Sequence, residues 1–344
     1  MAVDPVPYVV HGAKHSADVF RQAFFDSTSG AEGVSNPTSL GVKATGTPSN
    51  QVRVFPGGVL IPNTYQGGDG QSYTGRNASQ TLVDVPASDS TGAKTYYIIF
   101  RIQDPQFGGQ APSDPLVGPY AFIECVSTSA NISDPHYRLA KVTVPASTST
   151  ITNAMIEDLR SLAVPQREQL MFGRPRVVED AEPPISTYLK QKTSTGGEYF
   201  PGGNGSPNTF KVFVPEWASR ILIDSSWMSV LYKNGENPFG RYWVEYGDEY
   251  KDRTWPGNQQ FEFATQTFRF DAPAATGTRS DWRLMSSQHM PAKLRGKEIT
   301  VAFKAGRDDD GPTDAVSMDA WSGLGMHIAF AQTTLDPVTQ GDPA

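Results

Sequence analysis

The residue types that could support chemistry in this sequence are few and scattered. His11 and His15 stand four residues apart, a spacing that would place two imidazoles on one face of a helix and could begin a metal site. Such a site needs a third ligand and an ordered helix, and Pro5, Pro7 and Gly12 argue against a helix there. We therefore interpret both histidines as exposed polar residues.

Carboxylates form two short clusters. Asp308, Asp309 and Asp310 precede Gly311 and could offer oxygen ligands to Ca²⁺, although their spacing is not that of an EF-hand loop. A pair of carboxylates hydrolyses glycosidic bonds when it is held ~5–10 Å apart in a cleft. Adjacent carboxylates in glycine-flanked turns are more typical of solvated loop tips. The three aspartates remain weak candidate metal ligands, and we predict no metal and no other cofactor.

The motifs that announce common catalytic sites are missing from the sequence. It has no phosphate-binding loop, no dinucleotide fingerprint, no zinc-protease histidine pair and no serine nucleophile elbow. The single cysteine, Cys125, excludes an internal disulfide, and its apolar surroundings over residues 120–126 indicate a core thiol. We expect a protein that is not an enzyme.

Tryptophan is the remaining signal, since all six tryptophans lie in the C-terminal half. Aromatic side chains in strands mostly pack in a core. Trp255 and Trp282 lie in polar stretches, so we expect these two to be the most exposed. Together with Trp217 they are the candidate contacts, either with a neighbouring subunit or with a glycan, and we favour a core or interface role over sugar binding.

Composition and charge narrow the class of protein. Only 19% of the 344 residues are charged, while 32 glycines and 27 prolines favour short strands joined by many turns. A net charge of −7 argues against nucleic acid as a main partner. No apolar run approaches the ~18 residues of a membrane span, and the N-terminus lacks the pattern of a signal peptide. We expect synthesis in a cytoplasm.

The N-terminal half predicts an extended arm over residues 1–15 and then a β domain over residues 16–165 with one short helix. The helix is expected over residues 16–25 with Ser16 as its N-cap. Strands are expected over residues 51–55, 59–61, 81–85, 94–101, 121–126 and 138–144. The first two flank Pro56-Gly57-Gly58, which predicts a hairpin.

Residues 166–186 mix charges with prolines and are predicted to be a linker. A second β domain is predicted over residues 187–335, followed by a flexible tail over residues 336–344. Its expected strands include residues 209–214, 220–224, 227–232, 240–246, 298–303 and 325–330. About eight strands in a domain of this size indicate a jelly-roll-like β-sandwich. The predicted fold class is therefore all-β, with two antiparallel β domains.

Several segments resemble minor tail proteins of long-tailed phages that infect actinobacteria. The resemblance covers roughly residues 15–170 and rests on short motifs. They are Ala23-Phe-Phe-Asp26, Gln51-Val-Arg-Val-Phe-Pro-Gly-Gly58, Tyr73-Thr-Gly-Arg-Asn77, Arg101-Ile-Gln-Asp-Pro105 and Ile156-Glu-Asp-Leu-Arg160 with Pro165. The later segment Phe213-Val-Pro-Glu-Trp217-Ala-Ser-Arg-Ile221 looks like the sandwich domains appended to such proteins.

The resemblance implies a structural virion protein at the tail tip or fibre base, made in the host cytoplasm and without catalytic residues. It implies a symmetric homo-oligomer, for which a trimer is favoured, whose N-terminal domain docks to other phage tail proteins. Two alternatives stay open. The C-terminal sandwich could be a carbohydrate-binding module that recognises a host cell-wall glycan, or the chain could be a depolymerase acting on wall polysaccharide.

Overall fold

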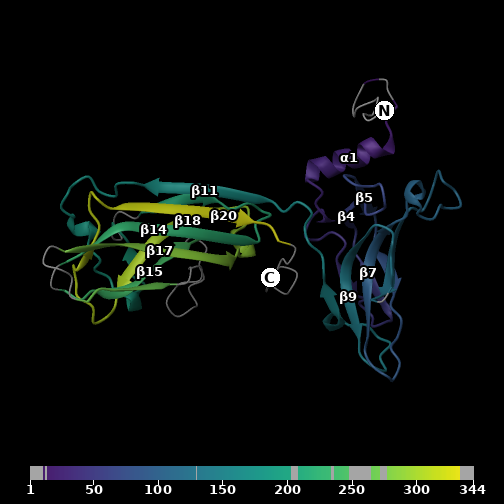
Figure 1. Ribbon diagram of the computed structural model, residues 1–344. Coiled ribbons are helices and arrows are strands. Elements are labelled where there is room, and N and C mark those ends of the chain that lie inside the picture. The colour runs from purple at the N-terminus through teal and green to yellow at the C-terminus, as the bar shows by residue number, and fades with distance from the viewer. Residues whose placement is uncertain are drawn as a thin grey trace. The chain divides into compact units, whose positions relative to one another are not determined.

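A computed structural model describes residues 11, 14–128, 130–202, 208–233, 236–247, 265–271 and 277–333. The described chain is built of antiparallel sheets with one α-helix and a few 3₁₀ turns, so the predicted all-β class is confirmed (Figure 1). The chain divides into two compact units that are described separately below. Unit 2 consists of Gln166–Gln332, and unit 1 consists of the residues before and after it. The helix has 12 residues, too few to cross a membrane, and it is the only α-helix in the described part of the chain.

Unit 1 begins with helix α1 (Ala17–Thr28) and continues as three small sheets. The first sheet has the order β1 (Gly33–Val34), β4 (Gly57–Pro62) and β5 (Ser72–Asn77). The second has the order β2 (Val42–Ala44), β3 (Gln51–Val54) and β6 (Thr81–Asp84). The third has the order β10 (Ile156–Asp158), β9 (His136–Val144), β7 (Lys94–Ile102) and β8 (Ala121–Ser127). Short 3₁₀ turns lie at η1 (Pro105–Phe107) and η2 (Asn153–Met155).

The core of unit 1 follows from simple alternation along these strands. In β3, Val52 and Val54 are fully buried while Arg53 between them turns to the other face. In β7, which lies between β9 and β8, Ile98, Phe100 and Ile102 enter the same core. All three sheets contribute buried side chains to this one hydrophobic cluster. Burial of one face per sheet is what fixes the register of these short strands.

The expected hairpin at Pro56-Gly57-Gly58 does not form. Strands β3 and β4 belong to different sheets, and Pro56 and Gly57 carry the chain from one to the other. Gly57 is required there because a Cβ atom would lie 2.5 Å from the Cα atom of Ser39. The prediction was wrong because the glycines serve a close approach between two chain segments, not a two-strand turn.

Helix α1 is anchored by a charged side chain. Ser16 caps it as expected, accepting a hydrogen bond from the Val19 N–H at 3.3 Å. Arg21 is the only buried residue of the helix, and its guanidinium donates four hydrogen bonds. The acceptors are side-chain oxygens of Asp18 at 2.6 Å, Gln71 at 2.6 Å, Gln106 at 2.7 Å and Asp104 at 3.2 Å.

Two aromatic rings complete the Arg21 environment. The guanidinium lies over the rings of Tyr73 and Phe107, at 5.5 and 5.2 Å from their centroids. The Tyr73 hydroxyl donates to Asp104 at 2.9 Å, and burial together with this hydrogen bond raises the pKa of Tyr73. Residues from α1, β5 and η1 therefore meet at one cation, which holds the helix on unit 1.

Unit 2 is a sandwich of two sheets. One has the order β11 (Arg167–Arg174), β20 (Gly323–Ala331), β14 (Arg220–Tyr232) and β17 (Thr278–His289), with β19 (Val316–Ser317) also pairing to β14. The other has the order β12 (Glu198–Tyr199), β18 (Glu298–Arg307), β15 (Phe239–Tyr246) and β16 (Gln266–Arg269), with β13 (Thr209–Phe213) on the same edge as β12. Its 3₁₀ turns include η3 (Ile185–Thr187), η4 (Thr193–Thr195) and η6 (Ala292–Leu294).

The strand order of unit 2 is that of a jelly roll, as predicted. Consecutive long strands mostly cross from one sheet to the other, and the first strand, β11, pairs with the last, β20. The space between the sheets holds a dense aromatic core. The Trp282 ring stacks on Tyr242 at 4.8 Å and on Phe268 at 4.6 Å, and Trp227 packs edge-on against Phe303.

Two segments differ from the sequence-based expectation. The predicted linker, residues 166–186, contains strand β11, which pairs with β20 over its whole length. Strand β17 was not expected at all, since its sequence is mostly polar. Both strands lie at the edges of their sheet, where only one side needs a neighbour and exposed side chains outnumber buried ones. Most of the predicted arm and the whole predicted tail lie outside the described residues.

We predict that Arg21→Gln will release helix α1 and destabilise unit 1 by roughly 3 kcal/mol, because it leaves Asp104 and Asp18 without their buried cation. Urea unfolding would measure the free energy, and hydrogen exchange over residues 17–28 would report the helix. Lys141→Gln is the matched control, since its ion pair with Glu157 is exposed and screened by solvent and should contribute little to stability. Unchanged helix protection in Arg21→Gln would contradict the anchoring role.

Candidate functional site

The three candidate tryptophans differ in their outcome. Trp282 is 3% exposed, and its indole N–H donates to the Tyr232 hydroxyl inside the core, so the expectation that it is exposed was wrong. Successive side chains of a strand point to opposite faces, so the polar Asp281 and Arg283 are exposed while Trp282 between them is buried. Trp217 is partly buried against the same core. Trp255 lies outside the described residues.

The candidate metal ligands form no cluster. Asp308, Asp309 and Asp310 are exposed, and the carbonyl oxygens of this loop accept hydrogen bonds from the guanidinium of Arg307. These contacts place a fixed positive charge beside the loop, which works against binding of a Ca²⁺ ion there. His15 packs edge-on against the Phe20 ring at 6.1 Å between centroids. No group of three or more metal-ligating side chains is found in the described ranges.

An exposed tryptophan that the sequence did not single out lies in the turn between β19 and β20. Trp321 is 70% exposed, and its backbone N–H donates to Asp319 at 2.9 Å. Asp319 is 2% exposed and forms a two-pronged ion pair with Arg279. Burial alone would raise the pKa of Asp319, but the hydrogen bonds from Arg279 and the turn hold it below its usual range.

Further bonds fix this turn to strand β14. Ser322 Oγ donates to the Ser229 carbonyl at 2.8 Å and accepts from the Asp319 N–H at 3.0 Å. Ser229 lies in a bulge of β14 and adopts a positive φ of 58°. The Trp321 ring is thus presented to solvent from a turn whose backbone is bonded on both sides. The fixed backbone means that little backbone entropy is lost when a ligand stacks on the ring.

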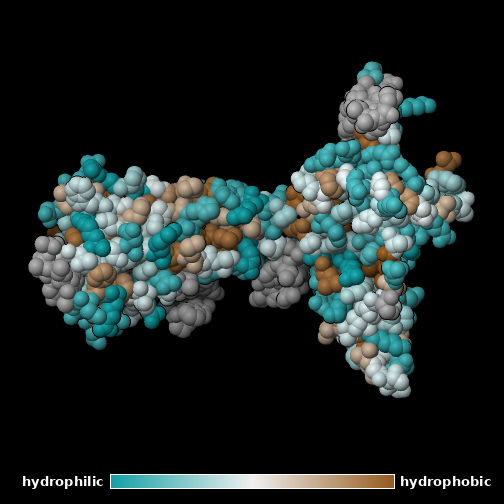
Figure 2. Space-filling model, in the orientation of Figure 1, coloured by the Kyte–Doolittle hydropathy of each residue, from teal (hydrophilic) through white to brown (hydrophobic). Residues whose placement is uncertain are grey.

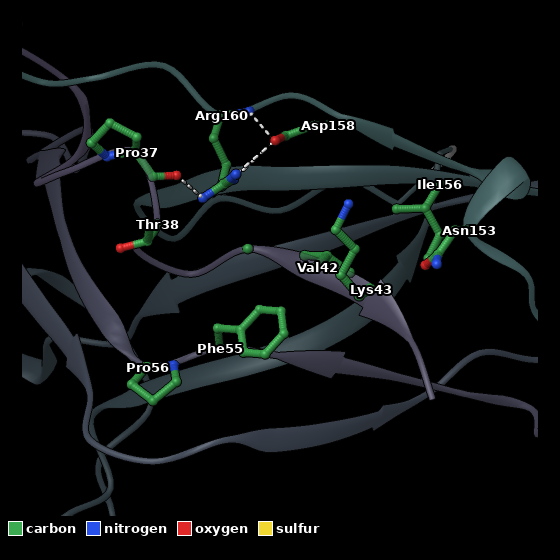
Figure 3. A pocket seen from close by; sticks show the side chains of 11 residues that line it. Pro37, Thr38, Val42, Lys43, Phe55, Pro56, Asn153, Ile156, Asp158 and Arg160 are labelled. Atoms are coloured by element: carbon green, nitrogen blue, oxygen red, sulfur yellow. Dashed lines mark hydrogen bonds and ion pairs between the residues drawn. The ribbon is translucent and has the colours of Figure 1, made fainter. Parts of the chain in front are cut away.

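A cavity of about 420 Å³ opens in unit 1 (Figure 3). Arg160 and Asp158 form one wall, Phe55 and Pro56 the opposite one, and Lys43 lies between them. The remaining lining residues are Pro37, Thr38, Gly41, Val42, Asn153 and Ile156. The volume suits a small ligand or part of a peptide, and the mixture of apolar walls with a few charges is typical of binding sites.

Arg160 holds the upper wall of the cavity together. Its guanidinium pairs with both oxygens of Asp158, at 2.9 and 2.7 Å, and donates to the carbonyls of Pro37 and Ser39. The Arg160 side chain is 8% exposed, so these bonds are largely shielded from water. The Asp158 carboxylate and the carbonyls of Pro37 and Ser39 therefore all accept hydrogen bonds from Arg160. The charge of Asp158 is neutralised by this contact.

Surface hydropathy shows no broad apolar area on the face seen in Figure 2, where hydrophobic residues form small separate patches. The large apolar side chains that are most exposed among the described residues lie in both units. They include Leu116, Met171, Val117, Ile185, Met285 and Trp321.

Comparisons with known proteins give no family. No protein-family model matches the sequence, and no curated protein matches it. Solved structures align only loosely, with 10–13% identity in the three examples that follow. Dimeric latent PorU from Porphyromonas gingivalis aligns over 93% of this chain and 26% of its own length, with a TM-score of 0.26. The chain thus spans about a quarter of PorU.

Two further structures align over most of both chains. The VP2 subviral particle of infectious bursal disease virus aligns over 93% of this chain and 79% of VP2, with a TM-score of 0.25. The tandem CBM22 domains of Paenibacillus barcinonensis Xyn10C align over 88% and 97%, with a TM-score of 0.21. Scores in this range do not correspond to a shared overall fold, so the functional argument rests on the chain itself.

The thiol of Cys125 lies on β8, and burial raises its pKa to about 11. A raised pKa means less thiolate, so we predict that at about pH 8 the folded protein reacts with iodoacetamide roughly a hundredfold more slowly than the chain in urea. The rate should rise about tenfold per pH unit until the thiol titrates. Mass spectrometry of the alkylated peptide measures both rates, and equal rates would contradict the prediction.

Proposed function

We propose that this chain is a structural, non-enzymatic component of a phage tail tip or fibre base and that it works as a homo-oligomer, with a trimer favoured. The observation that carries the proposal is how the segments with the tail-protein resemblance lie in the fold. Phe55 and Pro56 from one segment face Asp158 and Arg160 from another, about a hundred residues later, across a single cavity.

These segments also depend on one another for their conformation. Gly57 lets the chain pass within contact of Ser39, and Arg160 donates a hydrogen bond to the Ser39 carbonyl. Two of the resembling segments, residues 51–58 and 156–160, thus meet at one cavity. Their convergence supports the interpretation that residues 15–170 are one module of the tail-protein type.

Helix α1 offers a surface for assembly. Phe20 and Phe24 follow each other by one turn and are 41% and 40% exposed, while Arg21 on the adjoining face is buried. Large aromatic side chains exposed along a well-anchored helix are typical of residues that become covered in an assembly. We infer that α1 contributes to the contact between subunits.

For the assembly, we predict a solution mass near three times the 37.4 kDa of one chain in light scattering. Phe24→Glu should shift the species towards the monomer because it places a charge in the contact. Met285→Glu is the control, since Met285 is also exposed but lies in unit 2. Gold-labelled antibodies against the chain should mark the tail tip of particles of the phage that encodes it. A monomer combined with unlabelled particles would refute the proposal.

A second candidate function, glycan recognition by unit 2, is favoured by Trp321. A largely exposed indole on a turn with a fixed backbone, close in the chain to the Arg279–Asp319 ion pair, combines a stacking face with polar groups. Sugar rings bind proteins through this combination of stacking and hydrogen bonding. The same sandwich could therefore both pack in a virion and contact the host wall.

For glycan recognition, we predict that Trp321→Ala weakens binding of the protein to purified host cell-wall polysaccharide at least about tenfold, equivalent to about 1.4 kcal/mol. The melting temperature should stay unchanged, because the ring packs on nothing in the core. Met285→Ala removes a similarly exposed apolar side chain and should bind normally. Wild-type protein that fails to bind the polysaccharide would exclude this second function.

A further inference from the structure

The loop between η1 and β8 presents two adjacent aliphatic side chains almost completely to solvent. Leu116 is 96% exposed and Val117 is 81% exposed. We call residues 109–119 the tip loop. Contiguous apolar surface of this kind marks interaction sites, since covering it removes apolar area from water.

Hydrogen bonds hold the backbone of the tip loop in place. The Gln103 N–H donates to the Tyr120 carbonyl at 2.8 Å and closes the base of the loop. At the other end, the side chain of Asp114 accepts from the Leu116 N–H at 2.9 Å, and the Tyr120 hydroxyl donates to the Pro115 carbonyl at 2.8 Å. A backbone that is already ordered loses less entropy when the tip is buried in a partner.

The tip loop carries a negative charge beside its apolar residues. Asp114 is exposed, and within the described residues only one of its two carboxylate oxygens accepts a hydrogen bond. No lysine or arginine occurs between Gln103 and Tyr120. Insertion of an apolar tip into a lipid surface is favoured by neighbouring basic residues. The acidic loop therefore favours a protein partner that has a cation beside an apolar site.

The cavity of unit 1 has these complementary features (Figure 3). Phe55 and Pro56 form its apolar wall, and Lys43 lies between this wall and the wall formed by Arg160 and Asp158. Among the described residues, none forms a hydrogen bond or an ion pair with the Lys43 ammonium, and Asp158 is paired with Arg160. The volume of about 420 Å³ is large enough for two aliphatic side chains and a neighbouring carboxylate.

We propose that the tip loop of one copy of this chain inserts into the cavity of a second copy. Leu116 and Val117 contact the apolar wall, and Asp114 pairs with the ammonium of Lys43. The tip is exposed in the chain itself, so a subunit does not fill its own cavity. The inference rests on the proposed homo-oligomer and names the residues of one contact within it.

In a trimer this contact is head-to-tail. The tip loop and the cavity are different surfaces of unit 1, so each subunit gives its tip to one neighbour and receives the tip of the other. Three subunits joined in this way can close into a ring in which every tip is covered and every cavity is filled.

Leu116→Asp tests the tip and Lys43→Glu tests the cavity. In light scattering over a dilution series, each should raise the concentration of half-dissociation at least about tenfold. The first buries a charge against an apolar wall, and the second opposes Asp114 with a like charge. Leu82→Asp is the control, an exposed leucine on β6 (Thr81–Asp84) of the same unit, and should leave the oligomer unchanged. Leu116→Asp should keep the melting temperature of the subunit, because its side chain is almost fully exposed.

Mixing the two variants tests whether tip and cavity meet each other. The Lys43→Glu chain keeps an intact tip, and the Leu116→Asp chain keeps an intact cavity. At concentrations where each variant alone is monomeric, an equimolar mixture should form pairs with a mass near twice the 37.4 kDa of one chain. A mixture that does not pair would overturn the proposal.

The remaining outcomes separate this contact from the proposed function. A trimer that Phe24→Glu dissociates and Leu116→Asp leaves intact would overturn the contact while the assembly role stands. A wild-type chain that is monomeric at every concentration would overturn the homo-oligomer and this contact together. Wild-type protein that floats with phosphatidylcholine vesicles, when Leu116→Asp abolishes flotation without changing the oligomer mass, would overturn the contact in favour of a lipid surface.

Discussion

Every open sheet ends in strands whose outer N–H and C=O groups need partners, and this constraint organises the whole chain. In unit 2 the jelly-roll order brings polar strands β11 and β17 to the two edges of one sheet, where exposed side chains face solvent. In unit 1 the Ala44 N–H at the edge of strand β2 donates to the side-chain oxygen of Asn153.

Hydrogen bonds and ion pairs of polar side chains fix several segments in positions that hydrophobic burial alone does not determine. Arg21 fixes a helix that has no buried apolar residue of its own, and Arg160 ties the start of unit 1 to its last strand. The Asp319 and Arg279 pair does the same for the turn that carries Trp321. In each case a planar guanidinium meets several acceptors at once, which a lysine could not do.

The sequence predicted the features that follow from local residue patterns. It did not predict those that depend on contacts between residues far apart in the chain. The Ser16 cap, the strand around Phe100 and the jelly-roll class all followed from local pattern. Trp282 was wrongly expected to be exposed because its sequence neighbours are polar, although it lies on the buried face of its strand. Trp321 was overlooked because the exposure of a turn depends on the hydrogen bonds that hold the turn. The opposition of Lys43 and Arg53 depends on the pairing register of two strands, which no short motif specifies.

The pairing of β11 with β20 has a consequence for the order in which the protein is made. Strand β20 lies between β11 and β14, so the middle of this sheet is the last strand to leave the ribosome. Until residue 331 has emerged, β11 and β14 each expose an unpaired backbone edge, and most of the sandwich contacts are far apart in sequence. Such topologies fold slowly, so unit 2 can complete its folding only after β20 has been made, and until then the edges of β11 and β14 are open to association with other chains.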